Sequence, residues 1–403
     1  MIPSLCAPIL SLRRKAFPLS ADGYLSPGFT FSRATAATFV DRSGVVSLVG
    51  PNVPRFQDGR LLMEGDRVNL WTNSQQLPAA AGLGTGYSTA AVEAAFTYAY
   101  GAQTDYAGRG VLGKAIRFNG APAAAGVTRP MSYTMAAASM AADTEYAISR
   151  YAAWTGVGTP TGVTTILRSL GALSNPTGPS FDYSDTALRR YVIQRVTTSV
   201  PDAISIQQNS NYLAGANDLE QFIGGDQFEA GLFPSSLIPT TGGAATRSRD
   251  ICAGPLIGLG LPAMGFTLYG STVFVGAGQS SIHQPIFTVD AGATTARWSL
   301  YADGTGVRIR KDGGGNTAIP IGTMTPGVVL RWAASFDLIN MVMSACVAGG
   351  AVGTQGSPGV AMTHLRIGNS ASTAAPGFNA SAIWALPYAA TAMQLPSIAA
   401  GAP

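Results

Sequence analysis

Histidines and paired carboxylates are the residues of this 403-residue chain that could do chemistry. The two histidines are His283 and His364, and a Ser-His-Asp site would need one of them. The chain has no G-x-S-x-G nucleophile motif, no G-x-x-x-x-G-K-[ST] phosphate loop and no H-E-x-x-H metal motif. We therefore expect both histidines to lie in loops or interfaces.

Paired carboxylates could hydrolyse a glycan, with one acting as acid and the other as base or nucleophile. Three pairs lie close together in the sequence, each in a turn-like or edge context: Asp182 with Asp185, Asp218 with Glu220, and Asp226 with Glu229. With 21 acidic residues in the chain, such pairs arise by chance. We expect no enzyme, and a polysaccharide depolymerase is the least favoured function.

Metal and redox chemistry have little support. Cys6, Cys252 and Cys346 are far apart and odd in number, and no C-x-x-C occurs. A calcium loop of the D-x-[DN]-x-[DN]-G type is also missing. The nearest candidates for calcium are Asp303 and Asp312, on expected hairpin turns. We expect no cofactor, and buried thiols that suit a reducing cytoplasm.

Sugar binding would use an exposed aromatic ring as a stacking platform. Trp298 and Trp332 alternate with apolar residues, so we expect both in a core. Trp154 stands at a strand end beside a Thr-Gly pair and is the best candidate. The ligand-binding candidates are Trp154, Tyr183 and Tyr301.

Composition indicates a β-protein with few charges. Charged residues make up 11%, against about 25% in ordinary soluble proteins. This fits surface buried in an assembly, or a small-residue bias from a GC-rich genome. The net charge of +4 has one run of three basic residues, 13–15, and no basic stripe, so nucleic acid is not an expected partner. No apolar run predicts a membrane span, and prolines interrupt any signal peptide.

The 49 glycines and 25 prolines divide the chain into short alternating segments, which predict an all-β fold. Hairpins are expected over residues 38–49, around Asp303-Gly304, and between residues 328–336 and 340–347. Residues 307–310, Val-Arg-Ile-Arg, alternate, so we expect one face of this strand to be exposed to water. Residues 225–250 read as a strand followed by a Pro- and Gly-rich hinge. We expect an N-terminal arm and β-hairpin anchor module over residues 1–70, a jelly-roll sandwich over 71–247, and a sandwich over 248–403 whose strand spacing resembles the concanavalin A/laminin-G-like fold.

One set of residues resembles a module of bacteriophage virion proteins. The pattern runs SRAT-A-TFVD--GVV, then N-PRF, then LL-E--R-NL---S, and a later segment, QFEAGLFPSSLIPTTGGAATR, resembles the close of that family's middle domain. Within the pattern, Glu64 and Arg67 could pair, and Asn69 could cap a turn. The family-motif residues with an expected structural role are Arg33, Asp41, Pro54, Arg55, Phe56, Glu64, Arg67 and Asn69.

The resemblance implies a structural protein of a tailed phage, made and assembled in the bacterial cytoplasm and located in the virion. A tail-fibre or baseplate appendage, homotrimeric and adhering to a host surface glycan, is the leading expectation. The alternative is a capsid decoration or head-fibre protein that binds capsomers through its Pro-rich arm. Other virion proteins are the expected partners in either case.

Overall fold

The computed structural model describes much of the chain, and every structural statement below concerns those residues. They are residues 16–41, 44–72, 74, 87–88, 96–100, 114–120, 126–135, 140–159, 163–171, 177–181, 189–196, 204–212, 217–240, 242–275, 283–292, 296–304, 306–313, 315–369 and 379–403. Cys6 and the basic run at 13–15 lie outside them.

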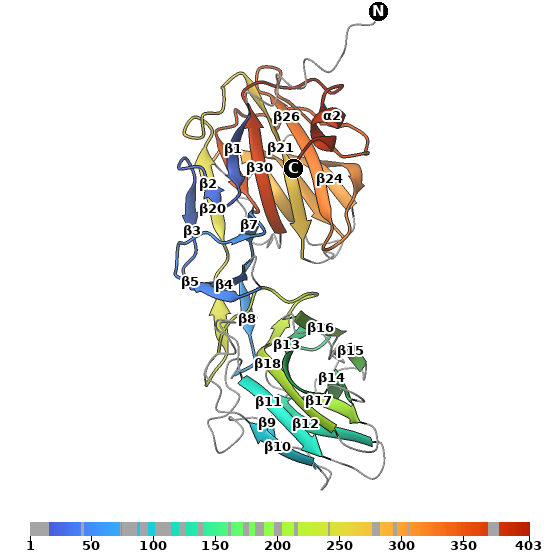
Figure 1. Cartoon of the computed structure of the whole chain (residues 1–403). Coiled ribbons are helices and arrows are strands. Elements are labelled where there is room, and N and C mark those ends of the chain that lie inside the picture. The colour runs from blue at the N-terminus through green and yellow to red at the C-terminus, as the bar shows by residue number, and fades with distance from the viewer. Residues whose placement is uncertain are drawn as a thin grey trace, which may run out of the picture. The chain divides into compact units, whose positions relative to one another are not determined.

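The chain divides into two compact units (Figure 1). Unit 1 consists of residues 1–36, 49–66 and 248–403, and unit 2 of residues 37–48 and 67–247. This division differs from the three consecutive segments expected from the sequence. Residues 1–70 form no module of their own, because β1 and β7 pair with β30 and β3 pairs with β20, more than 200 residues further along.

Unit 1 contains a nine-stranded antiparallel sheet in which β30, β21 and β26 lie side by side (Figure 1). The path runs β2-β1-β30-β21-β26-β27-β28, with β7 on β30 and β6 on β7. Its strands are β1 (Phe17–Ala21), β2 (Tyr24–Leu25), β6 (Phe56–Gln57), β7 (Arg60–Met63), β21 (Gly265–Phe274), β26 (Val329–Asp337), β27 (Val342–Val347), β28 (Gly353–Gln355) and β30 (Asn379–Leu386).

A seven-stranded antiparallel sheet, ordered β25-β24-β23-β22-β29-β20-β3, forms the other layer of unit 1. Its strands are β3 (Thr30–Ser32), β20 (Ile251–Pro255), β22 (Gln284–Asp290), β23 (Arg297–Asp303), β24 (Gly306–Asp312), β25 (Thr317–Thr323) and β29 (His364–Ile367).

The core of unit 1 lies between these two sheets. Trp298 of the seven-stranded sheet packs on Phe336 of the nine-stranded sheet, with ring centroids 5.9 Å apart, and Phe287 packs on Trp332 at 5.2 Å. All four side chains are fully buried. The expected core positions of Trp298 and Trp332 are confirmed, and unit 1 is a two-layer β-sandwich of the expected class.

The expected hairpins of unit 1 are present. Asp303 pairs with Gly306 between β23 and β24, and β26 pairs with β27 in a register that places Ala334 opposite Ala345. The helix α2 (Leu395–Ala400) packs through Leu395 on the outer face of the nine-stranded sheet, where it contacts Ala333 and Cys346. No helix of the described residues is long and apolar enough to cross a membrane.

Unit 2 contains two five-stranded antiparallel sheets, ordered β10-β11-β18-β13-β16 and β15-β14-β17-β12-β9. Their strands are β9 (Tyr87–Ser88), β10 (Phe96–Tyr100), β11 (Lys114–Gly120), β12 (Gly126–Met135), β13 (Glu145–Thr159), β14 (Val163–Gly171), β15 (Thr177–Phe181), β16 (Arg189–Val196), β17 (Ile204–Tyr212) and β18 (Asn217–Ala230). If β11 to β18 are counted as strands one to eight, the two orders contain 1-8-3-6 and 2-7-4-5. This is jelly-roll topology, so the predicted jelly roll is confirmed.

Two short strand pairs complete unit 2. The hairpin expected over residues 38–49 is formed by β4 (Ala37–Val40) and β5 (Val46–Val49), and Asp41 closes its turn by accepting from the amide of Val45 at 2.9 Å. The other pair is β8 (Arg67–Asn69) with β19 (Ala245–Arg247). Between β18 and β19 the chain is irregular, as the prolines and glycines predict.

Candidate functional site

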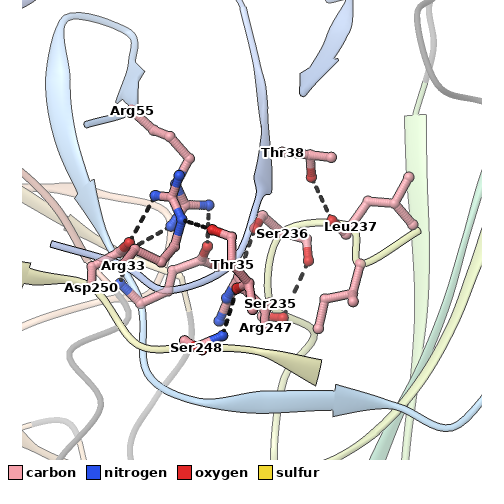
Figure 2. A network of polar contacts seen from close by, with 12 residues as sticks. Arg33, Thr35, Thr38, Arg55, Ser235, Ser236, Leu237, Arg247, Ser248 and Asp250 are labelled. Atoms are coloured by element: carbon pink, nitrogen blue, oxygen red, sulfur yellow. Dashed lines mark hydrogen bonds and ion pairs between the residues drawn. The ribbon is translucent and has the colours of Figure 1, made fainter. Parts of the chain in front are cut away.

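The motif residues of unit 1 meet in a buried ionic cluster, which we call the Asp250 cluster: Arg33, Arg55, Glu64 and Asp250. Arg33 follows β3, Arg55 precedes β6, Glu64 follows β7 and Asp250 precedes β20. Figure 2 shows Arg33 and Arg55 converging on Asp250. The distances are 3.0 Å from Arg33 Nη1 to Asp250 Oδ1 and 2.5 Å from Arg55 Nη2 to Asp250 Oδ2.

The Asp250 cluster is balanced in charge and held by several hydrogen bonds. Arg55 also binds Glu64 at 2.7 Å, and the amide of Glu64 donates to Asp250 at 2.9 Å. Arg33 donates to the carbonyl groups of Thr35 and Gly50. Burial opposes the charge of Arg55, but the carboxylates of Glu64 and Asp250 raise its pKa above the ordinary value. The cluster holds four strand ends together, and its burial leaves no surface for a ligand.

A second buried network lies in unit 2 and ties the motif segment 67–74 to residues 226–240. Asn69 accepts from the amides of Trp71 and Phe228, each at 3.0 Å, and donates to the carbonyl of Ile238 at 2.9 Å. Asp226 binds Arg150 through two hydrogen bonds of 2.5 and 2.9 Å. Asn69 thus fixes three segments, which is more than the turn cap expected from the sequence.

The pairing expected between Glu64 and Arg67 is wrong. Glu64 binds Arg55 in unit 1, whereas Arg67 in unit 2 lies 3.7 Å from Glu229. Glu64 follows β7 in unit 1, whereas Arg67 begins β8 in unit 2, so the boundary between the units separates the two residues although they are close in sequence. Glu229 is fully buried and also accepts from the amide and hydroxyl of Ser235.

The outward face of the seven-stranded sheet carries the candidate binding site, because it concentrates arginines. Alternation along β24 turns Val307 and Ile309 into the core and Arg308 and Arg310 outward, as expected from the sequence. We call the outward set the arginine face: Arg297, Arg308, Arg310 and Arg366, with Asp290, Asp303 and Asp312.

Strand register arranges the arginine face in rows across the sheet. In one row Asp312 lies opposite Arg297, which lies opposite Asp290. In the next row Arg310, Ser299, Thr288 and Arg366 follow one another across β24, β23, β22 and β29. A third row places Arg308 opposite Tyr301. Opposite charges therefore neighbour one another, an arrangement that stabilises a sheet.

Aspartates of the arginine face fix the orientation of the guanidinium groups by accepting hydrogen bonds from them. Asp303 accepts from Nε of Arg308 at 3.0 Å, and Asp312 accepts from Nε of Arg310 at 2.6 Å. Asp312 also accepts from Nε of Arg297 at 2.5 Å. The side chain of Arg308 is 37% exposed and that of Arg310 25%, against 7% for Asp312. The outermost charges of this region are therefore positive and pre-oriented.

The fourth arginine, Arg366, is oriented by an aspartate in the same way. Asp290 accepts from Nε of Arg366 at 2.5 Å, and its own side chain is fully buried while that of Arg366 is 16% exposed. Charge-assisted bonds of this kind restrict the guanidinium and lower the entropy lost when a ligand binds.

The rings of Tyr301 and His283 are in tilted contact, with centroids 4.5 Å apart and an interplanar angle of 46°. His283 Nδ1 lies 3.3 Å from Nη1 of Arg310. Burial and then the charge of Arg310 lower the pKa of His283, and burial and then Asp303 raise the pKa of Tyr301. Both rings are therefore uncharged near neutral pH.

Of the three ligand-binding candidates predicted from the sequence, the structure describes the side chain of one, Tyr301. Tyr301 is 2% exposed, so its ring could not serve as the exposed platform expected for it. Trp154 lies on β13, where only the backbone is described, and Tyr183 lies outside the described residues. Of the remaining motif residues, Phe56 packs against the core of unit 1, and Pro54 lies between β5 and β6.

The calcium and glycosidase candidates have other partners. Asp303 and Asp312 bind arginines, and among the described residues no group of three acidic, cysteine or histidine side chains could hold a metal. Asp226 and Glu229 are buried in unit 2. Asp182 and Asp185 lie outside the described residues. Asp218 and Glu220 lie in the first half of β18, where only the backbone is described.

Sequence reasoning missed the arginine face because its members come from four strands. The alternation of residues 307–310 predicted one exposed face and gave part of the signal. The pairing of β22 with β29, which brings Arg366 to Asp290 from 76 residues away, has no signal in the local sequence.

Comparisons with known proteins give structural neighbours only. No protein-family model matches the chain, and no curated protein is significantly similar in sequence. The carbohydrate-binding module (CBM40) of a Ruminococcus gnavus IT-sialidase, bound to alpha2,3 sialyllactose, is 12% identical, with a TM-score of 0.27 over 34% of this chain and 82% of that one.

Two further neighbours have similar scores. A SAP-like pentraxin from Limulus polyphemus is 15% identical, with a TM-score of 0.25 over 34% of this chain and 70% of that one. The NanB sialidase from Streptococcus pneumoniae, as its K499G mutant, is 10% identical, with a TM-score of 0.29 over 36% of this chain and 26% of that one. The argument for function rests on the arginine face.

Proposed function

We propose that the chain is a structural protein of a tailed-phage virion, displayed on the tail or baseplate, that adheres to a host surface glycan through the arginine face. The single observation that supports adhesion is the set of four outward arginines, each of which donates a hydrogen bond from Nε to an aspartate. Glycans present many hydroxyl and acidic oxygens, and oriented guanidinium groups supply the matching donors.

The virion role rests on the motif resemblance. Its support is that Arg33, Arg55 and Glu64 of the motif join in the Asp250 cluster, while Asn69 joins the network of unit 2. Motif residues from three strand ends therefore share one contact network in unit 1. We further propose a homotrimer with other virion proteins as partners.

The proposed activity is binding without catalysis. Asp303, Asp312 and Asp290 each accept hydrogen bonds from an arginine Nε. These carboxylates are therefore engaged in orienting the arginines. We propose no cofactor for this binding.

Adsorption competition tests the proposal. Host cells preincubated with saturating purified protein are expected to adsorb several-fold fewer phage particles that carry this chain, because the glycan is already occupied. Free phage is counted after a fixed time, with an unrelated β-sandwich protein as control. Unchanged adsorption at saturation would exclude the adhesin and favour a capsid decoration protein.

A further inference from the structure

Arg308 and Arg310 form the most accessible part of the arginine face. They stand two residues apart on β24, so their Cα atoms lie about 7 Å apart along the strand. Their side chains are 37% and 25% exposed, against 14% for Arg297 and 16% for Arg366. A ligand that reaches this sheet from solvent therefore meets these two guanidinium groups first.

The positive charge of this region exceeds the negative charge around it. On β23 and β24, three guanidinium groups, those of Arg297, Arg308 and Arg310, face only two carboxylates, Asp303 and Asp312. Asp312 is shared between two arginines. His283 adds no charge near neutral pH, because its pKa is lowered. One positive charge remains, and it would attract an anion.

The hydrogen-bonding geometry also leaves room for an acidic group. Asp303 accepts from Nε of Arg308, and the side chain of Arg308 remains 37% exposed. Arg310 uses Nε for Asp312 and Nη1 for His283. A carboxylate or sulfate accepts such donors with bonds about twice as strong as those of a neutral hydroxyl.

Two small or weakly polar side chains lie next to the two arginines. On β25, Ala318 lies opposite Arg310 and Pro320 opposite Arg308, and both are exposed. Small side chains at these positions leave space for a sugar ring beside the guanidinium groups.

We propose that the glycan is an acidic saccharide, whose carboxylate or sulfate binds Arg308 and Arg310 while its ring lies over Ala318 and Pro320. This inference rests on the proposed function and names its ligand class.

Titration calorimetry with surface polysaccharide extracted from host cells tests this inference. Three preparations are compared: native, carboxyl-reduced and desulfated. We expect removal of one acidic group to weaken binding at least tenfold, and the preparation that loses binding identifies the acid. Equal binding of all three would overturn the inference. Binding of the native material is also expected to weaken as salt rises, because exposed charges are screened.

Variants of the full chain localise the site. Arg308→Gln with Arg310→Gln is expected to weaken binding at least tenfold, and Arg308→Lys to weaken it less, since the charge remains while the fork is lost. The matched control is Arg249→Gln, which removes a 41%-exposed arginine paired with Asp66 and is expected to bind as the unchanged protein does. Unchanged binding of the double variant would overturn the inference.

The two proposals fail in different ways. If the protein blocks phage adsorption and all three polysaccharide preparations bind equally, the adhesin stands and the acidic ligand is wrong. If acidic polysaccharide binds tightly and adsorption is unchanged, the ligand class stands and the adhesin is wrong.

Discussion

Replacing Asp250 with alanine is expected to lower the free energy of unfolding of unit 1 by about 3–5 kcal/mol. The carboxylate is 3% exposed and binds two arginines that are themselves buried. Its removal takes a carboxylate partner from both Arg33 and Arg55, and the amide of Glu64 loses its acceptor. An uncompensated buried charge is costly because the desolvation of the ion is no longer offset.

The matched control is Asp66→Ala. Asp66 also binds an arginine, Arg249, but their side chains are 58% and 41% exposed and 3.5 Å apart. Exposed pairs of this kind contribute about 0–1 kcal/mol. Urea unfolding followed by hydrogen exchange of peptides from β20 and β7 measures both variants. If Asp250→Ala cost no more than Asp66→Ala, the Asp250 cluster would not hold unit 1 together.

Asp226→Ala is expected to have an effect of similar size, about 3–5 kcal/mol, on unit 2. Asp226 and Arg150 are each 2% exposed and share two hydrogen bonds. The guanidinium carbon of Arg150 also lies 5.9 Å from the ring centroid of buried Trp71. The guanidinium would keep this favourable cation–π contact after Asp226 is replaced. Hydrogen exchange of peptides from β13 and β18 would report the loss.

A double replacement distinguishes the effect of leaving Arg150 without its carboxylate from the effect of lost packing. Asp226→Leu combined with Arg150→Met removes both charges and keeps apolar volume, so we expect it to recover most of the stability lost in Asp226→Ala. If the double variant unfolded as easily as Asp226→Ala, the lost stability would come from altered packing and not from the charge of Arg150.

Short-range sequence patterns predicted much of the fold. Alternation identified Trp298 and Trp332 as core residues, and turn signals placed the hairpin at Asp303-Gly304. The jelly roll of unit 2 was also predicted. These features depend on neighbouring residues, where side-chain period and turn chemistry act directly.

Long-range pairing could not be predicted. The sequence placed residues 1–70 in a separate module, whereas β1 joins β30 from the other end of the chain. The same limit applies to Arg67, whose partner Glu229 lies more than 150 residues away. A strand edge accepts any chain that reaches it, so only the assembled fold decides the partner.

The candidate site shows the same contrast. Alternation along β24 indicated that Arg308 and Arg310 face outward, but not that Asp303 and Asp312 would orient them. Both aspartates were considered for calcium, because a lone acidic residue on a turn gives no sign of its partner. The sequence predicts an exposed ring for Tyr301, whereas that ring is buried and in tilted contact with His283.

Antibody labelling of intact virions tests the central claim, a surface-displayed tail adhesin, most directly. A specific antibody against this chain is imaged by electron microscopy on unfixed particles, with particles from a phage that lacks the gene as control. The account predicts label concentrated at the tail tip or baseplate. Label spread over the head would contradict the adhesin and identify a capsid decoration protein, and particles without label would contradict a virion role altogether.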